Sequence, residues 1–208
     1  MVEKTFPEAF PVPLRGQSVN AVATLKVSSG YVYSEFSVNV LGEILRIPSR
    51  VHLSARPEFP GLGLLERQMA FCLLTRSTDG FQRQAALREI LHINKPWSIP
   101  FVIALIGDYV VEIVQDIYAA LPDLERDVVS TFIRTNPAFY QLTRDRVMSY
   151  WDCYYRPQFR RSDYVGFKLL RQLDAICGIE QRRGPSANSC AGIRADRNEP
   201  RPSENSQG

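Results

Sequence analysis

The longest apolar run in the chain, residues 99–107, constrains the fold more than any other feature. It ends at Asp108 and is much shorter than the roughly 20 residues that a bilayer span requires. A run of this length predicts a helix that is buried on all sides. We therefore expect one long central helix from Ser98 to about Leu121, with the other helices packed around it and no membrane interaction.

Upstream of this run, apolar residues alternate with polar ones, which is typical of half-buried strands. The clearest case is 31–40, where Phe36, Val38 and Val40 share one face. Further strands are predicted at 19–27 and 43–47, with 51–53 extending or pairing with the last. The sequence thus predicts an antiparallel β-meander of three or four strands over 18–55, after an extended, proline-containing lead at 1–17.

After residue 60 the apolar spacing becomes helical, and about six helices are expected over 60–178 in the same globular unit. Asp79 is a predicted N-cap, with Gln82 three residues later as in a capping box. Asn136 followed by Pro137 is a second start signal. Residues 181–208 are polar, so a disordered tail is predicted there. The expected helices begin near residues 62, 79, 98, 122, 136 and 162.

Strands followed by helices predict an α+β fold rather than a parallel α/β fold. Helical pairs opening near Pro60, Ser98 and Asn136 are about 38 residues apart, just below the period of HEAT repeats. Residues 78–87 resemble the opening of a HEAT second helix in their aspartate, arginine, alanine and leucine. That resemblance covers one helix and implies a HEAT-like array of helical pairs. The pairs share no evident repeat, so a plain six-helix bundle is the preferred alternative.

Composition narrows the class of protein further. Hydrophobic residues make up 45% and charged residues 23% of the chain, which excludes a wholly disordered protein. The formal charge of +3 is small, whereas nucleic-acid binders usually carry a marked basic face. The tail contributes part of that charge, because 181–208 hold more arginines than carboxylates.

The cysteines and histidines exclude several kinds of site. The cysteines have no C-x-x-C spacing, which predicts reduced thiols and a cytoplasmic location. Two histidines are too few for a multi-histidine metal centre. The chain also has no P-loop, G-x-S-x-G or H-E-x-x-H motif, so we predict no catalytic residue and no cofactor. The cysteines are Cys72, Cys153, Cys177 and Cys190.

The segment 144–161 is the main candidate for a binding surface, because arginines alternate with aromatic residues there. Arginine, tyrosine and tryptophan are the residue types enriched at interface hot spots. Alternatively, Val147, Trp151 and Tyr154 pack inward on an amphipathic helix and the arginines are merely solvated. The predicted partner-binding residues are Tyr150, Tyr155, Arg156, Phe159, Arg160 and Arg161.

Asp108, Glu112 and Asp116 form a second candidate, since spacings of four place them on one stripe of a helix. Such carboxylates can share a divalent cation or act as an acid–base pair. The alternative, which we favour, is an exposed edge or salt bridges to neighbouring arginines. Di-metal helical bundles add a Glu-x-x-His motif from each of two further helices, and the chain has this spacing once, at Glu89 and His92.

Three functions follow from these candidates. The first is a non-catalytic interaction protein that binds a protein partner through the Tyr/Trp/Arg surface. The second is binding of a phosphate ligand or nucleic acid by the same arginines, and the third is a metal-dependent enzyme that uses the acidic stripe.

An acidic segment at 99–135 precedes the basic segment 144–161. The two segments either form ion pairs within one chain or support head-to-tail homo-oligomers.

Overall fold

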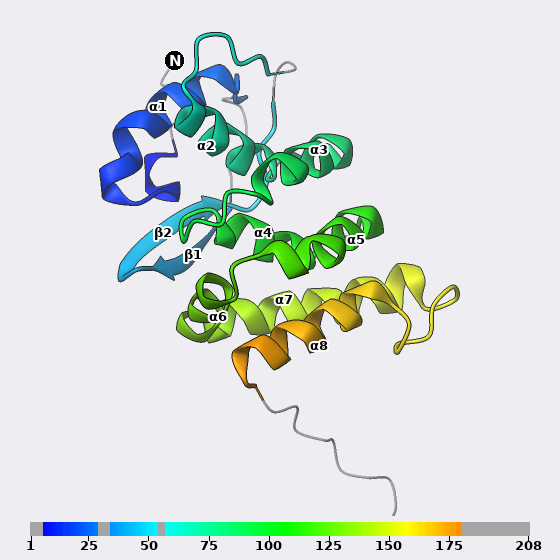
Figure 1. The fold of residues 1–208 in the computed structure, drawn as a ribbon. Coiled ribbons are helices and arrows are strands. Elements are labelled where there is room, and N and C mark those ends of the chain that lie inside the picture. The colour runs from blue at the N-terminus through cyan, green and yellow to red at the C-terminus, as the bar shows by residue number, and fades with distance from the viewer. Residues whose placement is uncertain (1–5, 29–33, 54–56, 180–208) are drawn as a thin grey trace, which may run out of the picture.

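The computed structural model of the chain describes residues 6–28, 34–53 and 57–179. Within these residues the fold is α+β, with eight α-helices and one two-stranded antiparallel sheet. The helices stack in successive layers, and the β-hairpin lies along one side of the stack (Figure 1). The predicted disordered tail, 181–208, lies outside the described residues.

The described part of the N-terminal segment, residues 6–28, is mostly helical. The extended lead predicted over 1–17 is therefore not found at 6–17, with residues 1–5 outside the described residues, and the strand predicted over 19–27 is wrong. Short 3₁₀ turns at Pro7–Ala9 and Val12–Leu14 lead into α1 (Arg15–Thr24). The alternation at 19–27 misled the prediction because a helical spacing also fits this segment. The buried residues, Ser18, Ala21, Val22 and Leu25, recur at positions i, i+3, i+4 and i+7.

The sheet is a single hairpin of β1 (Glu35–Val40) and β2 (Glu43–Pro48), so the expected three- or four-stranded meander is not confirmed. Leu41 and Gly42 form the turn with φ of +53° and +90°, the two-residue geometry that suits the right-handed twist of paired strands. Around 51–53 the structure has only isolated bridges, which pair Val51 with Ser77 and Val27 with Leu53.

Asp79 caps α3 (Gly80–Ile90) as predicted. Its carboxylate accepts hydrogen bonds from the Phe81 and Gln82 amides at 2.9 and 3.4 Å. The Gln82 side chain does not complete a capping box but accepts a bond from Ser77 Oγ. The preceding helix, α2 (Leu64–Leu74), packs against both α1 and α3.

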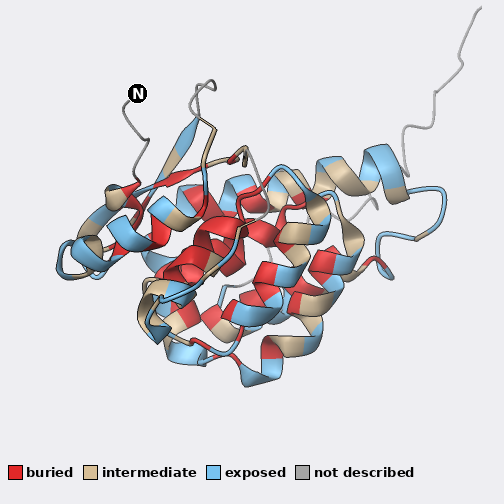
Figure 2. Cartoon of the chain, turned by 90° about the horizontal axis from the view of Figure 1, so that it is seen from above, coloured by how far each residue is buried: buried red, intermediate tan, exposed pale blue. Residues whose placement is uncertain are grey.

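The long central helix predicted over 98–121 is two helices, α4 (Ile99–Ile106) and α5 (Val111–Ala120). The break lies at Asp108, whose carboxylate is held by Arg83 and also accepts the Val110 amide at 3.1 Å. Every residue of α4 is buried, as the apolar run predicts, and buried residues gather in the middle of the molecule (Figure 2). None of the helices among the described residues is both long and apolar enough to cross a membrane.

The last three helices form the layer that carries the candidate site (Figure 1). Helix α7 (Pro137–Tyr150) packs against α4. Helix α8 (Val165–Cys177) packs against α5, α6 (Arg126–Thr135) and α7. A wider π-helical turn continues α7, closed by a hydrogen bond of 2.7 Å from the Arg156 amide to the Trp151 carbonyl. The predicted HEAT-like array of helical pairs is not confirmed. A 3₁₀ turn at Leu121–Asp123 precedes α6, and the π turn after α7 spans Trp151–Tyr155.

Candidate functional site

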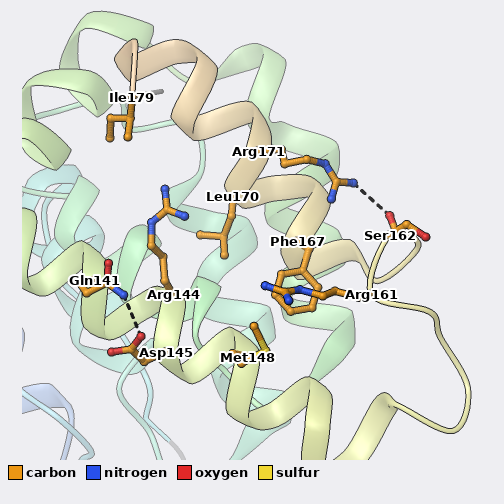
Figure 3. Close-up of a pocket in the computed structure, with 10 residues that line it drawn as sticks. All are labelled: Gln141, Arg144, Asp145, Met148, Arg161, Ser162, Phe167, Leu170, Arg171 and Ile179. Carbon is orange, nitrogen blue, oxygen red and sulfur yellow. Dashed lines mark hydrogen bonds between the residues drawn. The ribbon is translucent and has the colours of Figure 1, made fainter. Parts of the chain in front are cut away.

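A groove of about 770 Å³ lies between α7, α8 and the loop that joins them (Figure 3). We call it the α7–α8 groove. Its size falls in the range of ligand-binding clefts. Four apolar side chains, three arginines and three other polar residues form its walls: Met148, Phe167, Leu170 and Ile179; Arg144, Arg161 and Arg171; Gln141, Asp145 and Ser162.

Close packing of α8 on α7 sets the groove's geometry. Gly166 lies where the helices meet, and a Cβ atom there would be 2.8 Å from Val147 Cγ1 and 2.7 Å from the Tyr164 ring. Only glycine allows this approach without displacing either neighbour. The groove lies beside this contact and is lined by residues of both helices.

The end of α8 is fixed by a left-handed cap. Gly178 has φ of +64°, which lets the Ile179 amide donate to the Asp174 carbonyl at 2.9 Å. Arg134 donates two further hydrogen bonds, of 2.9 and 3.2 Å, to the Cys177 carbonyl. These bonds satisfy the last carbonyls of the helix, and they hold Ile179 at the edge of the groove (Figure 3).

Arg144 is the innermost cation of the groove, and its charge is balanced. It forms an ion pair with the buried carboxylate of Asp174 and lies over the Tyr140 ring, 4.7 Å from its centroid. The Tyr140 hydroxyl also donates to Asp174, at 3.0 Å. Burial raises the pKa of Tyr140, so this phenol stays a neutral donor. Arg144 therefore serves mainly to join α7 to α8.

Arg161 and Arg171 stand at the opposite edge and are exposed. The Arg161 guanidinium lies over the Phe167 ring at 5.0 Å, and Arg171 donates to the Ser162 carbonyl at 3.1 Å. Among the described residues, neither has a carboxylate within ion-pair distance. This edge thus presents two oriented, uncompensated positive charges beside the apolar floor.

The predicted partner-binding residues are only partly brought together here. Arg161 lines the groove, whereas Tyr150, Tyr155, Arg156, Phe159 and Arg160 are not part of its walls. Arg156 is exposed and pairs with Asp152 at 2.9 Å, one helical turn away.

The tyrosines of that prediction mainly hold the π turn against α5. The Tyr155 hydroxyl donates to the Tyr109 carbonyl at 2.7 Å and accepts the Val111 amide at 3.3 Å. Its ring stacks on Tyr164, with 5.3 Å between centroids. Tyr150 packs edge-on against Tyr109. Of the three residues that the alternative turns inward, Val147 is buried and Trp151 half-buried, whereas Tyr154 is 59% exposed.

The acidic stripe does not form one site. Asp108 is buried and paired with Arg83 and Arg50, Asp116 pairs with Arg88, and Glu112 is exposed on α5. Within the described residues, no group of three or more acidic, histidine or cysteine side chains is placed to hold a metal ion. The salt-bridge alternative therefore describes Asp108 and Asp116.

The sequence prediction missed most of the groove because the walls come from two helices. Gln141, Arg144, Asp145 and Met148 recur at i, i+3, i+4 and i+7 of α7. These positions lie on one helix face, but the face mixes polar, charged and apolar residues, so a count of charges along the sequence does not single it out. On α8, Phe167, Leu170 and Arg171 repeat the i, i+3, i+4 spacing. The i, i+3, i+4 spacing of these residues on each helix is the sequence signal from which the groove walls could have been predicted.

Comparison of the chain with known protein families, with curated proteins and with solved structures finds no match.

Proposed function

We propose that the chain is a non-catalytic interaction protein whose α7–α8 groove binds an acidic, partly apolar segment of a partner protein. The observation that carries this proposal is the pair of uncompensated arginines, Arg161 and Arg171, beside an apolar floor. Apolar side chains of a partner would be removed from water on that floor, and its carboxylates would meet the two guanidinium groups.

The shape and chemistry of the groove favour a peptide segment over a nucleic acid. Two roughly aligned helices offer the kind of surface into which an amphipathic helix lays its apolar face. The floor consists of aliphatic and thioether side chains with one phenylalanine. Single-stranded nucleic acids are bound largely by stacking of their bases on exposed aromatic rings, and this floor is poor in such rings. Asp145, which accepts a hydrogen bond from Gln141 at 2.9 Å, adds a negative charge to the wall, so the carboxylates of the partner are expected at the Arg161 and Arg171 edge.

A peptide selection tests this proposal. A library of random peptides is selected on the intact chain, and the enriched peptides are measured by fluorescence anisotropy. We expect enriched peptides in which glutamate or aspartate flanks leucine, isoleucine or phenylalanine. The double variant Arg161→Glu, Arg171→Glu should raise their Kd about tenfold or more, because it replaces attraction by repulsion at the same positions.

The matched control is Arg156→Glu, Arg160→Glu, which makes the same change in net charge on exposed side chains outside the groove. Its Kd should stay within about threefold of wild type, because exposed charges outside the groove act on the bound peptide only through electrostatic fields that the salt in solution screens. Equal losses in both double variants, or enrichment of basic peptides, would overturn the proposal.

A further inference from the structure

A second site lies just after the C-terminal end of α4, where arginines from separate elements converge on Asp108. Arg83, from α3, binds both carboxylate oxygens of Asp108, at 2.9 and 2.8 Å. Arg50, from the segment after β2, donates to the same Oδ2 at 3.0 Å. Asp108 thus already shares its one negative charge between two guanidinium groups.

Arg76, just after α2, adds a third guanidinium. Its Nε and Nη2 donate to the carbonyls of Pro48 and Ser49 at 3.2 and 2.6 Å. Arg50 donates to the same Ser49 carbonyl at 3.2 Å. Arg50 therefore lies between Arg76 and Arg83, and shares one acceptor with each.

Arg76 is fully buried, and its Nη1 has no hydrogen-bond partner among the described residues. A buried donor that is left unpaired is costly. Burial and then the positive charge of Arg50 lower the pKa of Arg76 to about 9. Arg146 and Arg83 act on it in the same direction.

Arg146, from α7, completes the group, which we call the arginine cluster: Arg50, Arg76, Arg83 and Arg146. Its side chain lies against Gly107, where a Cβ atom would come within 2.9 Å of Arg146 Cβ. Among the described residues, Asp108 is the one carboxylate within ion-pair distance of any member of the cluster. Two guanidinium groups therefore bind the single carboxylate, and the charges of Arg76 and Arg146 have no carboxylate of their own within ion-pair distance among the described residues.

We infer that the arginine cluster binds a small, doubly charged oxyanion, the phosphate group of a small molecule or free phosphate. Guanidinium groups match phosphate oxygens with paired, charge-assisted hydrogen bonds. A dianion would offset most of the excess positive charge and would supply an acceptor for the unpaired Nη1. The Arg50 side chain is 34% exposed, so the oxyanion would first contact the arginine cluster at this residue.

Thermal unfolding of the intact chain in phosphate tests this site, with chloride at matched ionic strength as the reference. Phosphate also stabilises proteins generally by exclusion from their surface, an effect that grows steadily with concentration. Binding to a site instead gives a melting temperature that rises logarithmically once the site is occupied. We expect a rise of several degrees at low millimolar phosphate, beyond the general effect.

The variants Arg50→Ala and Arg146→Ala leave the fully buried arginines in place and should each raise the phosphate Kd, measured by calorimetric titration, about tenfold. The control is Arg88→Ala, which removes an exposed arginine whose ion pair is with Asp116; its Kd should equal that of wild type. Tighter binding of glycerol phosphate than of inorganic phosphate indicates an esterified ligand, and the reverse order indicates free phosphate. Failure of both ligands to bind the wild type, or equal binding by all variants, would overturn the inference.

Discussion

Asp108→Ala is expected to lower the free energy of unfolding by about 3–5 kcal/mol, the usual cost of breaking a buried ion pair. The Asp108 and Arg83 side chains are 1% and 0% exposed, so the substitution leaves the Arg83 charge in the interior without its partner. It also removes the acceptor of the Val110 amide at the start of α5. Urea denaturation followed by circular dichroism measures the loss.

The control for this substitution is Asp152→Ala, because Asp152 belongs to an exposed pair with Arg156 one turn apart. Exposed pairs of this kind are worth less than about 1 kcal/mol. If Asp108→Ala does not fold, Asp108→Asn preserves the shape of the side chain and should show a smaller loss in the same direction. Equal stability of the Asp108 and Asp152 variants would show that the buried pair does not hold α3 to the α4–α5 junction.

Phe101→Ala is expected to cost about 3–5 kcal/mol, as large-to-small substitutions of buried aromatic residues do. Phe101 is 0% exposed in the first turn of α4 and stacks on Phe10, with 5.6 Å between ring centroids. The cavity would therefore open between the central helix and the N-terminal segment. Chemical denaturation again provides the measurement.

Phe81→Ala is the matched control, because the same side chain is 88% exposed on α3. Its removal should change the free energy of unfolding by about 0.5 kcal/mol or less. A Phe101→Ala variant as stable as Phe81→Ala would contradict the placement of α4 at the centre of the core.

The sequence predicts those parts of the fold for which local signals and burial agree. The apolar run at 99–107 predicts a buried helix, Asp79 predicts the start of α3, and Asn136 followed by Pro137 predicts the start of α7. The segment 19–27 was predicted wrongly because its small residues fit both periods, and contact with α2 decides between them.

The break at Asp108 could not be predicted, since it depends on a side chain from another helix. In the sequence Asp108 continues a helical stripe. In the fold it leaves that stripe to bind Arg83, which is 25 residues earlier in the chain. The same limit applies to the candidate site: arginine–aromatic density pointed to 150–161, whereas packing turned Tyr155 inward and brought Arg171 from α8 to Arg161.

Methyl NMR of the intact chain with a selected acidic peptide tests the central claim, that the α7–α8 groove is the binding surface, most directly. We predict saturable shifts of the Met148 and Leu170 methyl groups, both in the groove wall. The Leu142 methyl groups, which are exposed on α7 outside the groove, should not move. Shifts at Leu142 with none at Met148 and Leu170 would contradict the account.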